Sequence, residues 1–436
     1  MANDSHAMDN FWMPFSPNKE FKQEPRMFVK GEGMYLWTPD GKKLIDASSG
    51  LFCVAAGHCR KEIAEAVYKQ LNTLDYTMPF ARAHPNAFKL AQEVAEFTPE
   101  GLDRVFFVCS GSEAVDSAMK MALAYHRIRG QGHRQIFISR ERAYHGVNMG
   151  GVALSGMVNN RKVFGVGLPG VYHMRHTALP QNKFVKGQPE HGADLADDLQ
   201  RYCTMYGGEN IAAVFVEPTA GSFGCLPPPV GYLNKLRAIC DQHGILLVFD
   251  EVITGWGRMG ANFGAQAFGV TPDLMCMAKA ITNGAQPLGG IAVRTDIYDT
   301  ITNAGPAKGI EFFHGYTYSA HPACTAAGLA MMKIFREEKL IDRAAALAPY
   351  FADALFSLKG LPLVTDIRTI GLMGAVELAV DGNPGVRGHE FQKRLFDAGV
   401  NLKATGDNLI VAPPFISEKS HIDEFVGVMR DVISKG

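Results

Sequence analysis

Four places in the sequence put polar side chains directly after a run of apolar residues. The runs and the residues that follow them are VFFVC before Ser110-Gly111-Ser112, IAAVFV before Glu217, ILLVF before Asp250, and LMCMA before Lys279. Each of these residues alone has an ordinary explanation, such as capping the next helix or ending a strand in solvent. Ligands of open parallel sheets bind at the carboxyl ends of strands, so four such endings together predict one functional site.

This set of groups matches the chemical needs of one cofactor. A lysine amine forms a Schiff base with an aldehyde, and a carboxylate holds a protonated pyridine nitrogen. Hydroxyls and backbone N–H groups at a helix N-terminus bind phosphate, which Ser110-Gly111-Ser112 can supply. Together these groups predict a site for pyridoxal 5′-phosphate (PLP). Tyr144, in the AYHG motif, either stacks on the cofactor ring or is an ordinary core or surface aromatic residue.

The elements that must position this site alternate along the middle of the chain. Continuous apolar runs, typical of strands buried on both faces, predict strands at 105–109, 135–139, 211–217, 245–250 and 274–279. Helical patterns lie between them, for example at 112–127 and 231–243. The order of strand and helix predicts an α/β domain with a mostly parallel, doubly wound sheet flanked by helices.

The alternation of buried strands and helices ends near Met332. A helical pattern over 332–358 precedes β-rich runs, a helix near 389–398 and a last helix with Ser417 as its expected N-cap. In the last helix Ile422, Phe425, Met429 and Val432 fall on one face. We therefore expect a large PLP-binding α/β domain over 59–331 and a smaller α+β domain. The smaller domain takes the C-terminal segment 332–436 and the N-terminal segment 1–58.

Composition excludes several classes of protein. The 436 residues carry 43 Lys and Arg against 44 Asp and Glu, and 47% are hydrophobic, which excludes a disordered chain and gives no basic surface for nucleic acid. The sequence has no apolar run long enough for a membrane helix, and its first residues lack a secretory signal, so we expect a cytoplasmic protein. The 46 glycines exceed the usual share of about 7%. We expect part of this excess to form the site, at Gly111, Gly255, Gly257, Gly284, Gly289 and Gly290.

Metal and nucleotide sites have little support. The eight cysteines form no CxxC pair, and the HxxH of His173 and His176 lacks further ligands at metal-site spacing. Neither a GxGxxG following a strand nor a GxxxxGK[ST] occurs. We predict no bound metal.

The longest motif carries a family resemblance. The run LLVFDEVITGWGRMGANFGAQAFGVTPDLMCMAKAITNGAQPLGG resembles the signature of the class III, fold-type I PLP-dependent aminotransferases. SGSEA, AYHG, VEP and HGYTYSAHP resemble further motifs of that family, in its order. The resemblance extends from FWMPF to the last helix.

The resemblance implies a role for each matched residue. Lys279 would hold PLP as a Schiff base and move the proton, and Asp250 would pair with the pyridinium nitrogen. The remaining implied cofactor contacts are Glu217 supporting the site, Val252 and Tyr144 on opposite ring faces, His145 beside them, and Ser110, Gly111 and Ser112 at the phosphate. Thr317 would reach the phosphate of a neighbouring subunit, which implies a homodimer or a homotetramer.

Within the family the chain is most similar to the ω-amino acid:pyruvate (β-alanine:pyruvate) aminotransferases, through motifs such as DASSGLF, NNRKVFG and LPPPVGYL. Phe52 and Phe80 match aromatic residues of the substrate pocket. Lys403 stands where relatives have an arginine that clamps the substrate carboxylate, and Arg82 lies near the other pocket positions. Lysine keeps the charge and loses the planar fork. Both residues are either substrate ligands or solvated surface cations.

The implied activity is transfer of an amino group from an ω-amino acid or amine to pyruvate, with ping-pong kinetics, giving a semialdehyde and alanine. Three alternatives remain at this point. They are an aminomutase or racemase on the same fold, a 4-aminobutyrate or diamine aminotransferase that uses 2-oxoglutarate, and a PLP-binding protein without activity.

Overall fold

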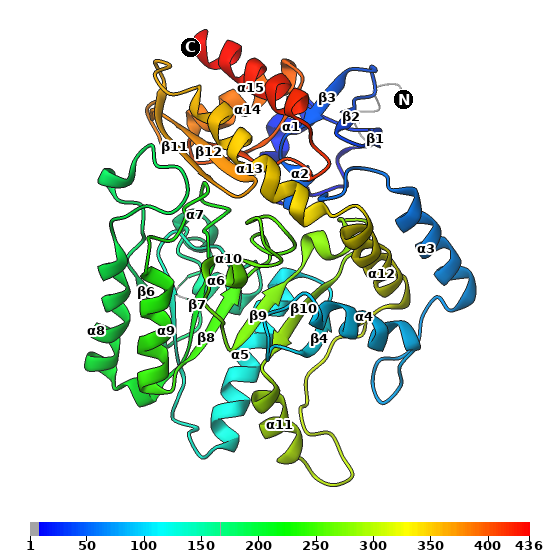
Figure 1. The fold of residues 1–436 in the computed structure, drawn as a ribbon, viewed down its shortest axis with the longest axis vertical. Helices are drawn as coiled ribbons and strands as arrows, with labels where there is room; N and C mark the ends of the chain where they lie inside the picture. The colour runs from blue at the N-terminus through cyan, green and yellow to red at the C-terminus, as the bar shows by residue number, and fades with distance from the viewer. Residues whose placement is uncertain (1–7, 166) are drawn as a thin grey trace.

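A seven-stranded sheet forms the centre of the computed structural model, which describes residues 8–165 and 167–436 (Figure 1). Its strand order is β4-β10-β9-β8-β7-β5-β6. The strands are β4 (Arg104–Val108), β5 (Ile136–Arg140), β6 (Val171–Met174), β7 (Ile211–Val216), β8 (Leu246–Asp250), β9 (Leu274–Met277) and β10 (Gly289–Val293). The five strands expected from the apolar runs are all present, within two residues of their expected ends.

The strand directions place the functional residues at one edge. Strands β9, β8, β7, β5 and β6 pair in parallel, and β10 runs antiparallel to both β9 and β4. Strand β4 therefore points the same way as the parallel strands, and the carboxyl ends of β4, β7, β8 and β9 share an edge. Strand β10 is not among the strands that the apolar runs predict, and its first residues, Gly289 and Gly290, were expected at the site. A Cβ atom on Gly289 would lie 2.7 Å from the Ser110 carbonyl oxygen, so close strand packing requires glycine there.

Helices cover both faces of this sheet. Every residue of β7 and β8 is buried, which explains their continuous apolar sequences. Phe215 and Val248 pack with α5 (Gly111–Ile128) on one face, and Val214 and Phe249 belong to the core that contains α9 (Tyr232–His243) on the other. This arrangement is the expected doubly wound sheet.

Two smaller sheets stand at the top of Figure 1, where the N-terminal and C-terminal segments lie together. One sheet joins β1 (Lys30–Glu32), β2 (Tyr35–Trp37) and β3 (Lys43–Asp46) to β13 (Val400–Asn401). The other has the order β11-β12-β15-β14, from β11 (Val364–Ile370), β12 (Met373–Leu378), β14 (Lys403–Thr405) and β15 (Asn408–Val411). Helices α13 (Leu340–Phe356), α14 (Val386–Asp397) and α15 (Lys419–Ser434) accompany these sheets.

Two details of the C-terminal region differ from expectation. The pattern over 332–358 is two helices, α12 (Pro322–Glu337) and α13, because Lys339 takes the left-handed conformation with φ 49° and ψ 44° between them. The last helix is capped by Glu418 and not by Ser417, whose hydroxyl donates to the Pro414 carbonyl at 2.6 Å. The expected apolar face of that helix is present, with Ile422, Phe425 and Met429 buried and Val432 half-buried. No described helix is long and apolar enough to span a bilayer.

Arg258 joins the three parts of the chain. Its buried guanidinium donates to the Leu372 carbonyl at 3.0 Å, the Pro413 carbonyl at 2.7 Å and the Ser49 hydroxyl at 3.1 Å. It also lies 4.5 Å from the centre of the Phe415 ring. The acceptors come from the N-terminal and C-terminal segments, whereas Arg258 follows β8, so this side chain fixes both segments to the large sheet.

We predict that Arg258→Met lowers the free energy of unfolding by about 3 kcal/mol, because buried acceptors of charged donors lose their partner. Arg201→Met is the matched control, since Arg201 is exposed, lies 3.7 Å from Asp198, and leaves that carboxylate its closer partner Arg175 at 2.8 Å. Urea denaturation of both variants measures the difference. Equal losses in the two variants would contradict the structural role of Arg258.

Candidate active site

A cavity of about 510 Å³ opens at the carboxyl edge of the central sheet. It is lined by Gly111, Ser112, Tyr144, His145, Gly146, Glu217, Asp250, Val252, Ile253, Ala278 and Lys279. Eight of the residues selected from the sequence therefore meet in one cavity.

Two buried carboxylates, Asp250 and Glu217, line the cavity. Asp250, at the end of β8, accepts a hydrogen bond from the Val252 N–H at 3.2 Å, and its Oδ2 lies 2.8 Å from Nδ1 of buried His145. Glu217, just after β7, accepts from the Tyr144 N–H at 3.0 Å and the Gly221 N–H at 3.1 Å. Burial raises the pKa of Glu217, and neighbouring Asp250 acts in the same direction.

Lys279 begins a short 3-10 helix two residues after β9, in the left-handed conformation with φ 55°. Such a conformation is uncommon for a residue with a side chain, and proteins retain it mainly at functional sites. Lys279 and the preceding Ala278 both line the cavity. Burial lowers the pKa of Lys279, while Cys53, Asp250 and Glu217 oppose that effect. A lowered pKa enlarges the population of neutral amine, which is the nucleophilic form.

The third group of lining residues comes from the start of α5. Ser110 is the N-cap of this 18-residue helix, and its hydroxyl accepts from the Glu113 N–H at 3.2 Å. Ser110 is not among the lining residues, whereas Gly111 and Ser112 are. The Ser112 hydroxyl also accepts from the Val147 N–H at 3.1 Å. A helix N-terminus with such hydroxyls and a positive dipole end suits a phosphate group.

Phe52 and Lys403 lie beside the cavity without lining it. Phe52 is buried with φ 62°, and the Lys403 ammonium lies 5.6 Å from the centre of its ring. Lys403, at the start of β14, is half-buried and has no hydrogen bond or ion pair for its ammonium within the described part of the chain. Burial and the nearby Lys279 lower the pKa of Lys403 to about 8, and Glu217 acts in the opposite direction.

Three predicted residues lie elsewhere in the single chain. Phe80 is 51% exposed, and Arg82 and Thr317 are also exposed, outside the cavity. Arg82 donates only to the neighbouring Ala81 carbonyl, at 2.7 Å. The segments that carry Phe80 and Thr317 touch, because the Tyr76 hydroxyl donates to the Thr317 carbonyl at 3.1 Å. The chain by itself therefore does not bring these three residues to the cofactor cavity.

Comparison with known proteins identifies the family. The family model for class-III aminotransferases matches residues 17–433. This chain belongs to the class-III aminotransferases. An omega-aminotransferase of Caulobacter vibrioides is 52% identical over 436 residues, covering 100% of this chain and 98% of that protein. A beta-alanine–pyruvate aminotransferase of Pseudomonas aeruginosa is 47% identical over 426 residues, covering 97% of this chain and 95% of that protein.

Solved structures agree with the sequence comparison. The omega transaminase from Pseudomonas jessenii in complex with PMP superposes with a TM-score of 0.95 at 31% identity, covering 100% of this chain and 98% of that one. The chain is thus a PLP-dependent aminotransferase with the fold expected from its motifs. Its substrates are an amino donor and a keto acid.

The residues of the cavity fit PLP. A Cβ on Gly111 would lie 2.9 Å from a Val252 methyl group, and one on Gly146 would lie 2.5 Å from the Ser112 hydroxyl, so glycine keeps both positions open. The buried His145 Nε2 lacks a hydrogen-bond partner within the described chain. Carboxylate, amine and helix N-terminus surround the same space. Nowhere in residues 8–165 and 167–436 do three or more His, Cys, Asp or Glu side chains gather into a metal-binding group.

Sequence reasoning missed some residues at the site and placed others wrongly there. Gly146, Ile253 and Ala278 line the cavity, and Gly146, with φ 95°, was visible within the AYHG motif. Cys53 is an electrostatic neighbour of Lys279 with no sequence signal of its own. Gly255 and Gly257 were expected at the site but fit against Phe263 and Phe415 in the core. They permit close packing of the loop that carries Arg258.

Gly111→Ala should weaken PLP retention on the order of tenfold, because overpacking against Val252 costs about 1–3 kcal/mol. Gly427→Ala is the control, since a Cβ there meets no atom within 4 Å. Dialysis followed by absorbance of the retained PLP measures the effect. Equal retention in both variants would show that Gly111 does not contact the cofactor.

Proposed function

We propose that this aminotransferase moves the amino group of an ω-amino acid, of the β-alanine type, to pyruvate by a ping-pong mechanism. The products are a semialdehyde and alanine. The observation that carries this proposal is the joint placement of Lys279, Asp250 and the α5 N-terminus around one cavity. The relative named beta-alanine–pyruvate aminotransferase, 47% identical over nearly the whole chain, supports the choice of substrates.

The residues divide the chemistry among them. When bound, PLP would supply an electron sink that acidifies the C–H bond on the carbon that carries the donor amino group. Asp250, oriented by His145 at 2.8 Å, stabilises a proton on the ring nitrogen of the cofactor. Lys279 attaches the cofactor in the resting enzyme and, once displaced as a neutral amine, moves the proton from the donor carbon. A depressed lysine pKa suits both tasks.

The neighbouring residues orient the cofactor and exclude water. Glu217 fixes the backbone of Tyr144 at 3.0 Å, so the two side chains reach the cavity together. Tyr144 and Val252 hold opposite faces of the ring, with His145 at its edge. Ser110, Gly111 and Ser112 bind the phosphate, Ser110 through its position as N-cap rather than through its engaged hydroxyl.

Lys403 binds the carboxylate of the substrate. Its ammonium has no protein partner within the described residues and lies over Phe52, next to the cavity. Buried cations without a partner are costly, and a substrate carboxylate would relieve that cost. A single charge without the arginine fork holds the carboxylate less rigidly, so we expect tolerance of donors of different length.

The exposed predicted residues support a homodimer. Phe80, Arg82 and Thr317 are exposed on two segments that touch through Tyr76 and Thr317. The second segment also carries Phe313 and Tyr318, 86% and 60% exposed. Large exposed apolar patches of this kind mark protein interfaces. In a second copy of the chain these residues would complete the neighbouring substrate and phosphate sites. We further propose that 1–58 and 332–436 form the small domain beside 59–331, and that the enzyme works in the cytoplasm.

We predict that Lys279→Ala abolishes the Schiff-base absorption of the resting enzyme and lowers turnover at least about 10³-fold, because both attachment and proton transfer are lost. Lys333→Ala, on an exposed helix face, is the control. Absorption spectra and alanine formation from β-alanine and pyruvate measure the two effects. Full turnover by Lys279→Ala would refute the assignment.

Lys403 also predicts a pH dependence. An ammonium with a pKa of about 8 is charged below that pH and loses its charge above it. The KM for pyruvate should therefore rise as the pH increases through about 8, whereas Lys403→Arg should keep a flat profile, because arginine stays charged. Initial rates across this range test the role. Identical profiles for the two enzymes would show that Lys403 does not bind the carboxylate.

A further inference from the structure

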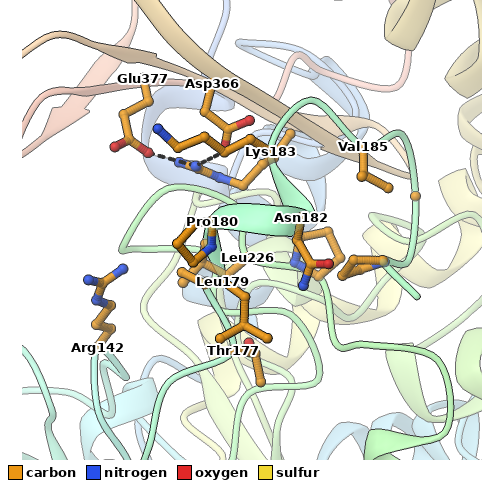
Figure 2. Close-up of a pocket in the computed structure, with 15 residues that line it drawn as sticks. Arg142, Thr177, Leu179, Pro180, Asn182, Lys183, Val185, Leu226, Asp366 and Glu377 are labelled. Atoms are coloured by element: carbon orange, nitrogen blue, oxygen red, sulfur yellow. Dashed lines mark hydrogen bonds and ion pairs between the residues drawn. The ribbon is translucent and has the colours of Figure 1, made fainter. Parts of the chain in front are cut away.

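A second cavity lies between loops that follow strands of the large sheet and the C-terminal sheet, apart from the cofactor site (Figure 2). It is open to solvent, spans about 730 Å³ including that open space, and shares no lining residue with the cofactor cavity. Loop residues of the segment 177–189 form one wall, and Asp366, Arg368 and Glu377 of β11 and β12 form the opposite one. Arg142 closes one end, two residues before Tyr144 of the cofactor site.

The charges on the C-terminal wall are already paired. Arg368 donates to Asp366 and, at 2.7 Å, to Glu377, and Figure 2 shows both contacts as dashed lines. Asp366 also accepts from the Ile367 N–H at 2.8 Å. The two carboxylates are therefore occupied by Arg368 and by backbone donors.

Arg142 has no such partner. Its guanidinium makes no hydrogen bond or ion pair with any residue of 8–165 and 167–436. It lies 4.8 Å from the centre of the Phe223 ring, and Glu377 attracts it electrostatically without a direct contact. In Figure 2 the guanidinium extends from its loop toward the Glu377 side of the cavity, with no dashed line to it. The backbone of Arg142 has φ 64°, a strained conformation that proteins retain mainly at functional positions.

Further lining groups lack partners as well. The Lys183 ammonium is exposed and unpaired within the described chain. The buried Thr177 hydroxyl has no hydrogen-bond partner and can donate to an anion, whereas the equally unpartnered Oδ1 of Asn182 can only accept. Three cations (Arg142, Lys183 and Arg368) face two carboxylates, so the cavity has one positive charge in excess.

We propose that this cavity is a second binding site, which takes a small monocarboxylate on Arg142. The planar guanidinium matches a carboxylate with two parallel hydrogen bonds, and Lys183 adds a second cation. A single negative charge balances the excess of one, whereas a phosphate dianion would exceed it and would be repelled about twice as strongly by Asp366 and Glu377. The bound carboxylate would link the loop that leads into Tyr144 to the loop that carries Lys183.

The test uses sodium propanoate, which lacks both the amino and the keto group and therefore cannot react. It is titrated into the holoenzyme of Lys403→Met, so that the proposed carboxylate ligand of the active site is absent, at constant ionic strength kept with sodium chloride. Because binding to the folded state raises its stability by mass action, the thermal midpoint should rise and saturate. Adding Arg142→Met should weaken the apparent affinity at least tenfold, while adding Arg201→Met should leave it unchanged.

Two further measurements, on alternative variants and by crystallography, complete the test. If Arg142→Met does not fold, Arg142→Lys and Lys183→Met should each weaken binding by a smaller factor. A crystal structure of the holoenzyme with propanoate should show density at Arg142. The site would be refuted by a shift that sodium chloride reproduces, by an Arg142 variant with unchanged affinity, or by density confined to the active site. A larger shift with inorganic phosphate than with propanoate would overturn the carboxylate class.

Discussion

The need to hold unlike charges in a buried space is the constraint on which this structure depends. Asp250 and Glu217 are buried at neighbouring strand ends, and Lys279 faces the same cavity. Buried charges are tolerated only where hydrogen bonds or opposite charges compensate them. His145 and backbone N–H groups perform that task for the two acids, and the parallel sheet fixes all of them at one edge. This compensation is incomplete, because burial still raises the pKa of Glu217 and lowers the pKa of Lys279. Both shifts favour the neutral forms and suit proton transfer.

The N-terminal and C-terminal segments lie beside this edge of the sheet and add residues next to the cavity. The N-terminal segment brings Phe52 to the cavity, β14 brings Lys403, and Arg258 fixes both segments through Ser49 and Pro413. A buried arginine that binds carbonyl groups rather than a carboxylate joins chain segments without neutralising charge near the site. The cavity at Arg142 also lies against the C-terminal sheet, and Arg142 precedes Tyr144 of the cofactor cavity by two residues.

Local sequence patterns were sufficient to locate the residues that follow the buried strands. They were insufficient for the substrate-pocket residues, which come from other segments. Parallel strands buried on both faces have continuous apolar sequences, so the positions after them, including Glu217 and Asp250, could be located without a structure. The break at Lys339 was not predictable, because the helical pattern continues through it. Phe80 and Thr317 could be assigned only by resemblance, since a single chain leaves them exposed. The unpaired state of Arg142 depends on contacts between distant segments that no local pattern records.

The central claim is that amino transfer runs in two separate halves on one enzyme. β-Alanine added to the holoenzyme without any keto acid tests it most directly, with absorbance for the cofactor and chromatography for the products. The account predicts conversion of PLP to pyridoxamine phosphate with one equivalent of semialdehyde per active site, and recovery of PLP with release of alanine when pyruvate follows. Continued turnover of β-alanine to an isomeric amino acid without keto acid, or no change of the cofactor, would contradict it.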